Sequence, residues 1–428
     1  MRIVYIAAGA GDSYCGACML DAAAARTLTA LGHETLVIPL YTPLRTDRDF
    51  PHLKRVFYGG INAYLEQRSA FFRKTPRFVD WIFDRPALLK LASHFAVSTR
   101  AEELGAMTVS VLRGEEGRQR KELLKLLDFL EERGKPDVAN LTNSLLSAIA
   151  PALKKRLGCA VVCMLQGEEA FVERLGQPFR DEAQALIRRN ALAVDLFIAP
   201  HESYADEMSE FLGVKRERVR VVAPGIDLAP YRPEGPRARE PFRVGYLSRL
   251  SPLKGLDLLV EAFRLLEGEK PGGAALAVAG ETVRPHGSYW KKLYKSLERE
   301  GLAARVDYAG EVDFAGKARF LKSLSVFCLP SRAVEHKAVA AIEALGAGVP
   351  IIVPDRGIFP EMIRSTGGGL LVAPEDPAAL ARAIARLRDD PAEANRLGAA
   401  AASGAAEHFS AKSMAERMVE IYREIARD

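Results

Sequence analysis

The sequence lacks the features of several specialised classes of protein. No apolar run reaches the roughly 20 residues that a membrane-spanning helix needs. Residues 1–11 lack the longer apolar core of a secretory signal peptide. Five cysteines in 428 residues are few and odd in number, which favours free thiols in a reducing compartment over a disulfide framework. We therefore expect a cytoplasmic protein.

The charge balance is only weakly biased. The formal net charge is +5 and the pI is about 8.8, which is compatible with an anionic ligand or an anionic membrane surface. This excess is well below the charge density of a dedicated nucleic-acid-binding protein. We expect no nucleic-acid partner.

What the sequence does contain is an alternation of short apolar runs and helical segments. Most of the runs are continuously apolar, which is typical of strands buried on both faces of a parallel sheet. The first series of predicted strands covers 2–8, 35–40, 55–60, 137–141, 160–165, 196–200 and 218–224. The pattern restarts after a linker rich in proline, glycine and arginine (225–242), with strands at 242–248, 275–280, 305–310, 325–330, 350–354 and 368–372.

This alternation predicts an α/β protein with two Rossmann-like, doubly wound parallel-sheet domains. The first would span 1–230, with a helical insertion at about 62–133, and the second 231–408. Ligands of such sheets bind beyond the carboxyl ends of the strands, so we expect the domains to face one central cleft. Residues 409–428 are expected to form a helix that crosses back to the first domain.

The segment "SRAVEHKAVAAIEALGAGVP" (331–350) carries two glutamates eight positions apart, Glu335 and Glu343. We predict a helix from about Glu335, starting where the strand 325–330 ends. The start of such a helix is a ready site for phosphate, and a carboxylate two turns further on can accept the hydroxyls of a ribose. Taken alone, the spacing also fits one glutamate that compensates the helix dipole and one that faces solvent.

The surrounding segments give the pair a context. "EALGAGVPIIVPDRGIFPEMI" and "GGGLLVAPEDPAALARAIARL" follow it, and "GYLSRLSPLKGLDLLVEAFRLL", "VVAPGIDLAPYRP" and "LTALGHETLVI" precede it. Together they resemble the retaining nucleotide-sugar glycosyltransferases of family 4, which have the GT-B fold. The resemblance covers nearly all of residues 242–390 and is looser over residues 1–240.

The resemblance implies a role for each matching residue of the second domain. Arg249 and Lys254 would bind the diphosphate of the donor and stabilise the charge of the leaving group. Glu343 would hold the ribose and Glu335 would face the transferred sugar. The backbone N–H groups of Ala338 and Val339 would lie near the diphosphate. His336 and Lys337 depart from the family pattern beside the sugar.

In the first domain the resemblance is carried by fewer residues. Gly16 would let the backbone approach the donor phosphate. Gln166 stands where many family members place a histidine over the sugar, and it can hydrogen-bond but not act as a base. Glu168 or Glu169 would orient the acceptor, with loop solvation as the alternative. Retention in this family is described as a front-face displacement in which the leaving phosphate helps to deprotonate the acceptor.

The predicted function is therefore a retaining glycosyltransferase that uses a nucleotide-sugar donor, with UDP as the expected nucleotide. We expect no metal and no other cofactor. The acceptor would be a saccharide, a lipid-linked sugar or a small molecule. Basic and aromatic residues interleave over 53–100, which predicts either an acceptor-pocket wall or a peripheral contact with the inner membrane face.

Other interpretations remain open from the sequence. A non-catalytic sugar-nucleotide sensor would account for Gln166 and for the departures at 336–337. "YCGAC" would make Cys15 and Cys18 a redox pair at a helix start, or a zinc site together with Cys159 and Cys163. A GT-B phosphorylase or epimerase would use the same cleft.

Overall fold

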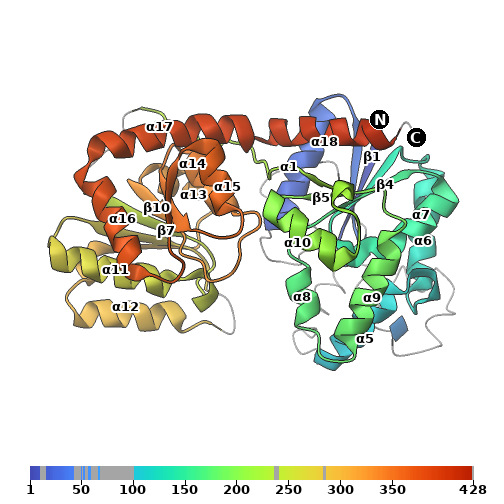
Figure 1. Ribbon diagram of the computed structural model, residues 1–428, viewed down its shortest axis with the longest axis horizontal. Coiled ribbons are helices and arrows are strands. Elements are labelled where there is room, and N and C mark those ends of the chain that lie inside the picture. Colours follow the sequence, from blue (N-terminus) through green and yellow to red (C-terminus); the bar gives the residue numbers. More distant parts are fainter. Residues whose placement is uncertain are drawn as a thin grey trace. The chain divides into compact units, whose positions relative to one another are not determined.

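The chain folds into two compact units, Met1–Ala223 with Met414–Asp428, and Pro224–Ser413. Each unit contains one six-stranded sheet (Figure 1). The computed structural model describes residues 1–9, 16–42, 50, 52–53, 56–58, 66–67, 101–235, 241–282 and 286–426.

The sheet of the first unit has the strand order β2-β1-β3-β4-β5-β6, and every neighbouring pair is parallel. Its strands are β1 Arg2–Ala7, β2 Glu34–Pro39, β3 Val138–Leu141, β4 Ala160–Met164, β5 Leu196–Ala199 and β6 Val219–Val221. Its helices are α1 Gly16–Ala30, α5 Ala101–Leu112, α6 Arg120–Glu132, α7 Ala150–Leu157, α8 Glu169–Glu173, α9 Phe179–Ala191, α10 Glu202–Leu212 and α18 Ala411–Ile425, whose first residues belong to the second unit.

Both faces of this sheet are buried, as the continuous apolar runs predict. Ile3 and Tyr5 of β1 belong to one hydrophobic cluster, with residues of α1 and α18. Val4 and Ile6 point the other way, into a cluster built by α6, α7, α9 and α10. A strand covered by helices on both sides has no solvent-facing row of side chains, so its sequence shows no alternation.

The second unit repeats the architecture with the parallel order β12-β11-β10-β7-β8-β9. Its strands are β7 Arg243–Leu247, β8 Ala275–Ala279, β9 Val306–Gly310, β10 Val326–Cys328, β11 Ile351–Pro354 and β12 Gly369–Val372. Its helices are α11 Leu256–Glu269, α12 Tyr289–Arg299, α13 Phe314–Lys322, α14 Val339–Gly346, α15 Phe359–Thr366, α16 Pro377–Asp389 and α17 Pro391–His408. The predicted α/β class with two doubly wound parallel sheets is confirmed.

Two local predictions are wrong. The strand expected at 55–60 does not form in its described part, because Val56, Phe57 and Tyr58 follow an irregular path. Tyr58 instead donates its backbone N–H to Leu40 O at 2.8 Å, and its side chain is buried against the sheet. The helix expected from Glu335 begins at Val339, for a reason given below. Most of 53–100, with its basic and aromatic residues, lies outside the described residues.

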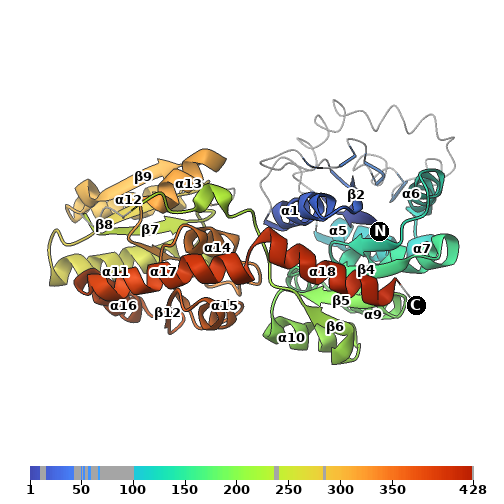
Figure 2. The same ribbon diagram turned by 90° about the horizontal axis from the view of Figure 1, so that it is seen from above.

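The helix α18 completes the first unit, beside α1 in both views (Figures 1 and 2). Its Tyr422 is fully buried and donates its hydroxyl to Asn140 Oδ1 of β3 at 3.0 Å. The Tyr422 hydroxyl also lies 3.1 Å from that of Tyr5 on β1. This chain of buried polar groups ties the C-terminal helix to the neighbouring strands β1 and β3.

We predict that Tyr422→Phe destabilises the first unit by about 1–3 kcal/mol, because it leaves buried groups of Asn140 and Tyr5 without their partner. The midpoint of urea unfolding measures the loss. Tyr294→Phe on α12 is the matched control, since the described residues offer its hydroxyl no hydrogen-bond partner. Equal midpoints for the two variants would contradict the assignment.

Candidate functional site

The predicted diphosphate and sugar residues of the second unit lie together. Lys254 ends a 3-10 helix, Pro252–Lys254, that follows β7, and Glu335 lies in the loop that follows β10. Because β7 and β10 are parallel neighbours, these loops leave the same edge of the sheet. Lys254 Nζ forms an ion pair with Glu335 Oε1, and the side chains are 19% and 12% exposed. The structure therefore brings these two predicted residues into direct contact.

Ser331 and Gly255 fix the approach of the two loops. The Ser331 hydroxyl donates to Glu335 Oε1 at 2.8 Å. Gly255 has φ +71°, and a Cβ at this position would lie 1.9 Å from Pro330 O. Only glycine combines this left-handed conformation with such a close backbone approach. Gly255 is therefore needed for the close approach of the two loops. This is a structural reason for the Lys254-Gly255 pair, in addition to the predicted binding of phosphate by Lys254.

Arg332, which the sequence analysis did not single out, connects the loop after β10 to the segment 252–257. Its guanidinium makes two hydrogen bonds to the Asp257 carboxylate, at 2.8 and 2.7 Å, and donates to Pro252 O at 2.8 Å. Tyr289 donates its hydroxyl to Asp257 Oδ1 at 2.6 Å. Burial alone would raise the pKa of Asp257, but the hydrogen bonds from Arg332 and Tyr289 outweigh it and lower that pKa. The carboxylate therefore stays charged and anchors the segment that carries Lys254.

The main chain of Glu335 is held by the loop after β11. Ile358 donates its N–H to Glu335 O at 2.9 Å, and Arg356 donates to Ser331 O at 2.6 Å. Gly357 has φ +60°, and a Cβ there would lie 2.5 Å from Glu335 O. Glu335 is thus fixed on both its side chain and its backbone.

The helix α14 starts only after Ala338, which has φ 43° and ψ 44°. This left-handed conformation ends the extended loop and is why the helix does not begin at Glu335 as predicted. The first hydrogen bonds of the helix run from Ala341 and Ile342 to Ala338 O. The N–H groups of Ala338 and Val339 precede this ladder, and their predicted place near the diphosphate stays a prediction.

Glu343 is 2% exposed inside α14. Two groups contact its Oε1: the Tyr231 hydroxyl at 2.8 Å and Lys317 Nζ at 2.6 Å. Tyr231 lies in the 3-10 helix Ala229–Tyr231 and Lys317 on α13. Within the described part of the chain both contacts go to Oε1 and none to Oε2, and the predicted ribose contact of Glu343 stays a prediction. Sequence reasoning missed Lys317, although "EVDFAGK" offered it four residues after the helix cap Asp313.

The remaining predicted donor residues are less constrained. Arg249 is exposed after β7, and the described side chains include no partner for it. His336 and Lys337 are half-buried between Glu335 and the start of α14. Gly16 is the first residue of α1. The preceding loop, with Cys15, lies outside the described residues, so the predicted phosphate contact of Gly16 stays a prediction.

In the first unit, Gln166 follows β4 and is half-buried. Its Nε2 donates to Asp21 Oδ1 of α1 at 3.3 Å, and its backbone N–H donates to Glu168 Oε2 at 2.6 Å. Because the amide nitrogen of Gln166 donates to Asp21, the amide oxygen points away from Asp21. Asp21, which is 3% exposed, was not singled out from the sequence.

Glu168 is 5% exposed and accepts the N–H of Ser144 at 2.8 Å as well as that of Gln166. Burial raises the pKa of this carboxyl, and the backbone hydrogen bonds counteract only part of the rise. Its neighbour Glu169 accepts the hydroxyl of Tyr204. Glu168 therefore ties together the loops after β3 and β4, and its predicted role toward the acceptor stays a prediction.

The cysteines described in this unit are buried, and the pKa values of Cys159 and Cys163 are raised. Cys18 is buried in α1, and burial raises the pKa of Cys159 to about 11 and that of Cys163 well above its usual range. A high thiol pKa disfavours both nucleophilic and metal-binding chemistry at neutral pH.

Among the helices of the described residues, none combines the length and hydrophobicity needed to cross a bilayer.

Two family models match consecutive parts of the chain. Residues 105–230 match the model described as Glycosyltransferase Family 4, and residues 229–404 match Glycosyl transferases group 1. The second match contains Lys254, Glu335 and Glu343.

Characterised relatives align with about half of the chain. A D-inositol 3-phosphate glycosyltransferase of Streptomyces avermitilis is 33% identical over 242 residues, which cover 54% of this chain and 52% of the relative. The lipopolysaccharide core biosynthesis mannosyltransferase LpsB of Rhizobium meliloti is 31% identical over 191 residues, covering 43% of this chain and 52% of that protein. The chain thus spans about half the length of the curated relatives it matches.

Solved structures match over the full length. HepE of Anabaena, in complex with UDP, superposes with a TM-score of 0.69 at 18% identity and covers 99% of this chain and 100% of its own. Sucrose-phosphate synthase of Thermosynechococcus elongatus gives a TM-score of 0.69 at 17% identity, with 99% of each chain covered. At such identities the likeness shows the fold alone. Fold and family models agree, and the chain belongs to the family 4 glycosyltransferases with the GT-B fold.

Proposed function

We propose that the protein is a retaining glycosyltransferase that transfers a sugar from a nucleotide donor, with UDP as the nucleotide. The observation that carries the proposal is the contact between Lys254 and Glu335 at the carboxyl edge of the second sheet. It joins the residue expected to bind diphosphate to the residue expected to face the sugar. The HepE structure with UDP supports the choice of nucleotide.

The chemistry follows from charge. The bond between the anomeric carbon and the phosphate oxygen breaks, and the leaving diphosphate gains negative charge. Lys254, Arg249 and the N–H groups at the start of α14 would stabilise this charge. In a front-face displacement the acceptor oxygen forms its bond to carbon on the same side, and its proton passes to the departing phosphate oxygen.

Donor binding requires an exchange of partners. Lys254 has to leave Glu335 for the diphosphate, and Glu335 then turns to the hydroxyls of the sugar. Glu343 accepts the ribose hydroxyls on Oε2 while Tyr231 and Lys317 keep Oε1. The lysine that neutralises Glu335 in the absence of donor is thus reused to neutralise the donor.

Turnover decides between a transferase and a sugar-nucleotide sensor. A panel of UDP-, GDP- and ADP-linked sugars is screened first by thermal shift, because a bound donor stabilises the fold by mass action. Release of nucleotide from the stabilising donor is then measured with and without candidate saccharide, lipid-linked and small-molecule acceptors. Tight binding without any nucleotide release would refute the enzyme.

Glu343→Gln is expected to weaken UDP binding by about 1–2 kcal/mol, because charge-assisted bonds to the ribose become neutral ones. Isothermal titration with UDP measures the change. The substitution also leaves Lys317 unpaired, so Glu343→Gln with Lys317→Met is the control. If the double variant regained full affinity, the loss would come from the unpaired lysine and not from the ribose contact.

Glu335→Gln is expected to have opposite effects on binding and turnover. UDP without its sugar should bind several-fold tighter, a gain in binding free energy on the order of 1 kcal/mol. The reason is that Lys254 no longer has to break an ion pair with residue 335 before it binds UDP. Sugar transfer should fall at least about tenfold because the sugar loses its carboxylate. Titration with UDP and initial rates provide the two readouts. Weaker UDP binding in this variant would contradict the exchange of partners.

Lys254→Ala should lower kcat by about 10²–10³-fold and change KM far less, because the charge of the leaving group is greatest in the transition state. Lys291→Ala, on the exposed face of α12, should leave the rate unchanged.

Turnover should also survive EDTA, since we propose that the protein supplies the cations. The sequence has one Asp-x-Asp, at 47–49, outside the described residues. Loss of activity in EDTA with recovery in Mn²⁺ would refute a metal-free site.

A further inference from the structure

The second unit contains a pocket that the proposed function does not use. Its volume is about 540 Å³, within the range of small-molecule sites. The lining residues come from one face of α13 and from the segment that leads to β7: Pro230, Glu234, Phe314, Ala315, Ala318, Arg319, Lys322 and Ser323.

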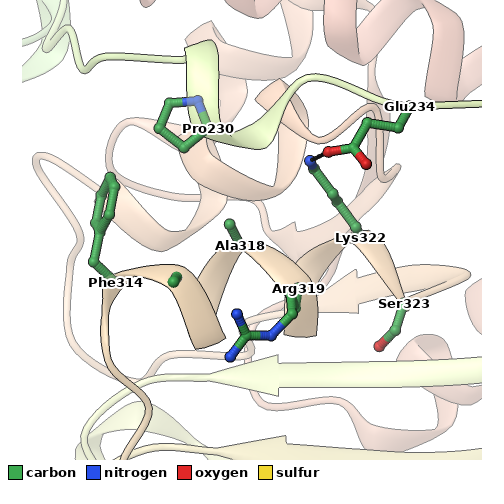
Figure 3. A pocket seen from close by; sticks show the side chains of 8 residues that line it. Pro230, Glu234, Phe314, Ala318, Arg319, Lys322 and Ser323 are labelled. Atoms are coloured by element: carbon green, nitrogen blue, oxygen red, sulfur yellow. Dashed lines mark hydrogen bonds and ion pairs between the residues drawn. The ribbon is translucent and has the colours of Figure 1, made fainter.

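Figure 3 shows how these side chains frame the pocket. Pro230 and Phe314 lie on one side, the Glu234–Lys322 ion pair lies opposite, and Arg319 and Ser323 lie along the remaining edge. Ala318 lies between them, so α13 presents only a small side chain at the centre. The pocket thus has an apolar side and a charged side.

The charges of the lining favour an anion. Lys322 is neutralised by Glu234, whereas Arg319 is exposed and has no side-chain partner among the described residues. A guanidinium binds phosphate or carboxylate through two parallel hydrogen bonds. Across the pocket, the ring of Phe314 and Pro230 offer flat apolar surfaces to the body of the ligand.

The same residues touch the groups that hold Glu343. The ring of Phe314 packs edge-on against the ring of Tyr231, with centroids 6.1 Å apart, and lies 5.6 Å from Lys317 Nζ. Tyr231 and Lys317 are the two partners of Glu343 Oε1. Phe314 therefore belongs both to the pocket lining and to the support of the proposed ribose residue.

We propose that this pocket binds a small organic anion, a phosphate or carboxylate on a body with a flat apolar face, and that the bound anion strengthens nucleotide binding. By packing against Phe314 and Pro230, the anion favours the positions of Tyr231 and Lys317 in which they hold Glu343 Oε1, and therefore the position of Glu343 that receives the ribose. The coupling rests on the proposed function of Glu343, whereas the anion site itself does not.

Phenyl phosphate is the probe, because it joins a dianion to an aromatic ring. Titration calorimetry should detect its binding to the intact protein, and inorganic phosphate or phenol alone should bind much more weakly. Arg319→Gln should weaken the binding at least fivefold. Arg299→Gln, an exposed arginine on α12, should leave it unchanged. Ala315→Leu, which fills the pocket without changing charge, should also weaken it.

Two outcomes would overturn the anion site. One is equal binding of phenyl phosphate to Arg319→Gln, Ala315→Leu and the parent protein. The other is loss of binding in Lys254→Ala with retention in Arg319→Gln, which would place the anion at the donor site instead.

The coupling is measured separately. Saturating phenyl phosphate should tighten UDP binding about fivefold, a value at the low end of usual couplings, and UDP should tighten phenyl phosphate by the same factor. Arg319→Gln should abolish both effects. Unchanged UDP affinity with phenyl phosphate bound would overturn the coupling. Binding of phenyl phosphate by a protein that does not bind UDP at all would instead uphold the anion site and refute the proposed function.

Discussion

Charges at the carboxyl edge of the second sheet have to be paired because they are largely buried, and this constraint shapes the segments around them. Glu335 and Glu343 each meet a lysine from a different part of the chain, Lys254 and Lys317. Removing one partner from a buried pair is costly, since it leaves an uncompensated charge. These pairs link the loop after β7 to the loop after β10, and α13 to α14.

Such pairs contribute little net stability, because desolvation offsets most of the attraction. Their value here is that they can be exchanged. In the proposed function, a diphosphate would offer Lys254 what Glu335 provides, so the cation would already lie near the donor when it arrives. Lys254 would stabilise the leaving group once its ion pair with Glu335 has been exchanged.

Much of the fold could be predicted because its signals are local. A continuous apolar run such as Ile351–Pro354 indicates a strand buried on both faces, and the structure confirms it. The run at 55–60 also contains apolar residues, yet Phe57 and Tyr58 fill the core as part of an irregular segment. Hydrophobicity predicts burial there, but it does not determine whether the segment forms a strand.

Lys254, Glu335 and Glu343 were singled out because their segments resemble those of the family, and the structure places Lys254 against Glu335. The supporting residues of the site were not singled out, since each acts across a long separation. Arg332 reaches Asp257, and Lys317 reaches Glu343, only after the sheet has brought their loops together. Glu168, singled out for chemistry, is also buried and accepts two backbone N–H groups, a structural role that the sequence did not indicate.

Ala338 has a backbone conformation that its residue type disfavours. A residue with a Cβ in the left-handed region costs on the order of 1–2 kcal/mol, and this one immediately precedes α14. The strain persists because the neighbouring positions are fixed independently: Glu335 by Lys254, Ser331 and Ile358, and Ile342 by its bond to Ala338 O. With both flanks held, the chain has to turn sharply at Ala338. That turn separates the N–H groups of Ala338 and Val339 from the helical ladder. The loop that holds Glu335 therefore also sets where the positive end of α14 begins, the place where the proposed function puts the diphosphate.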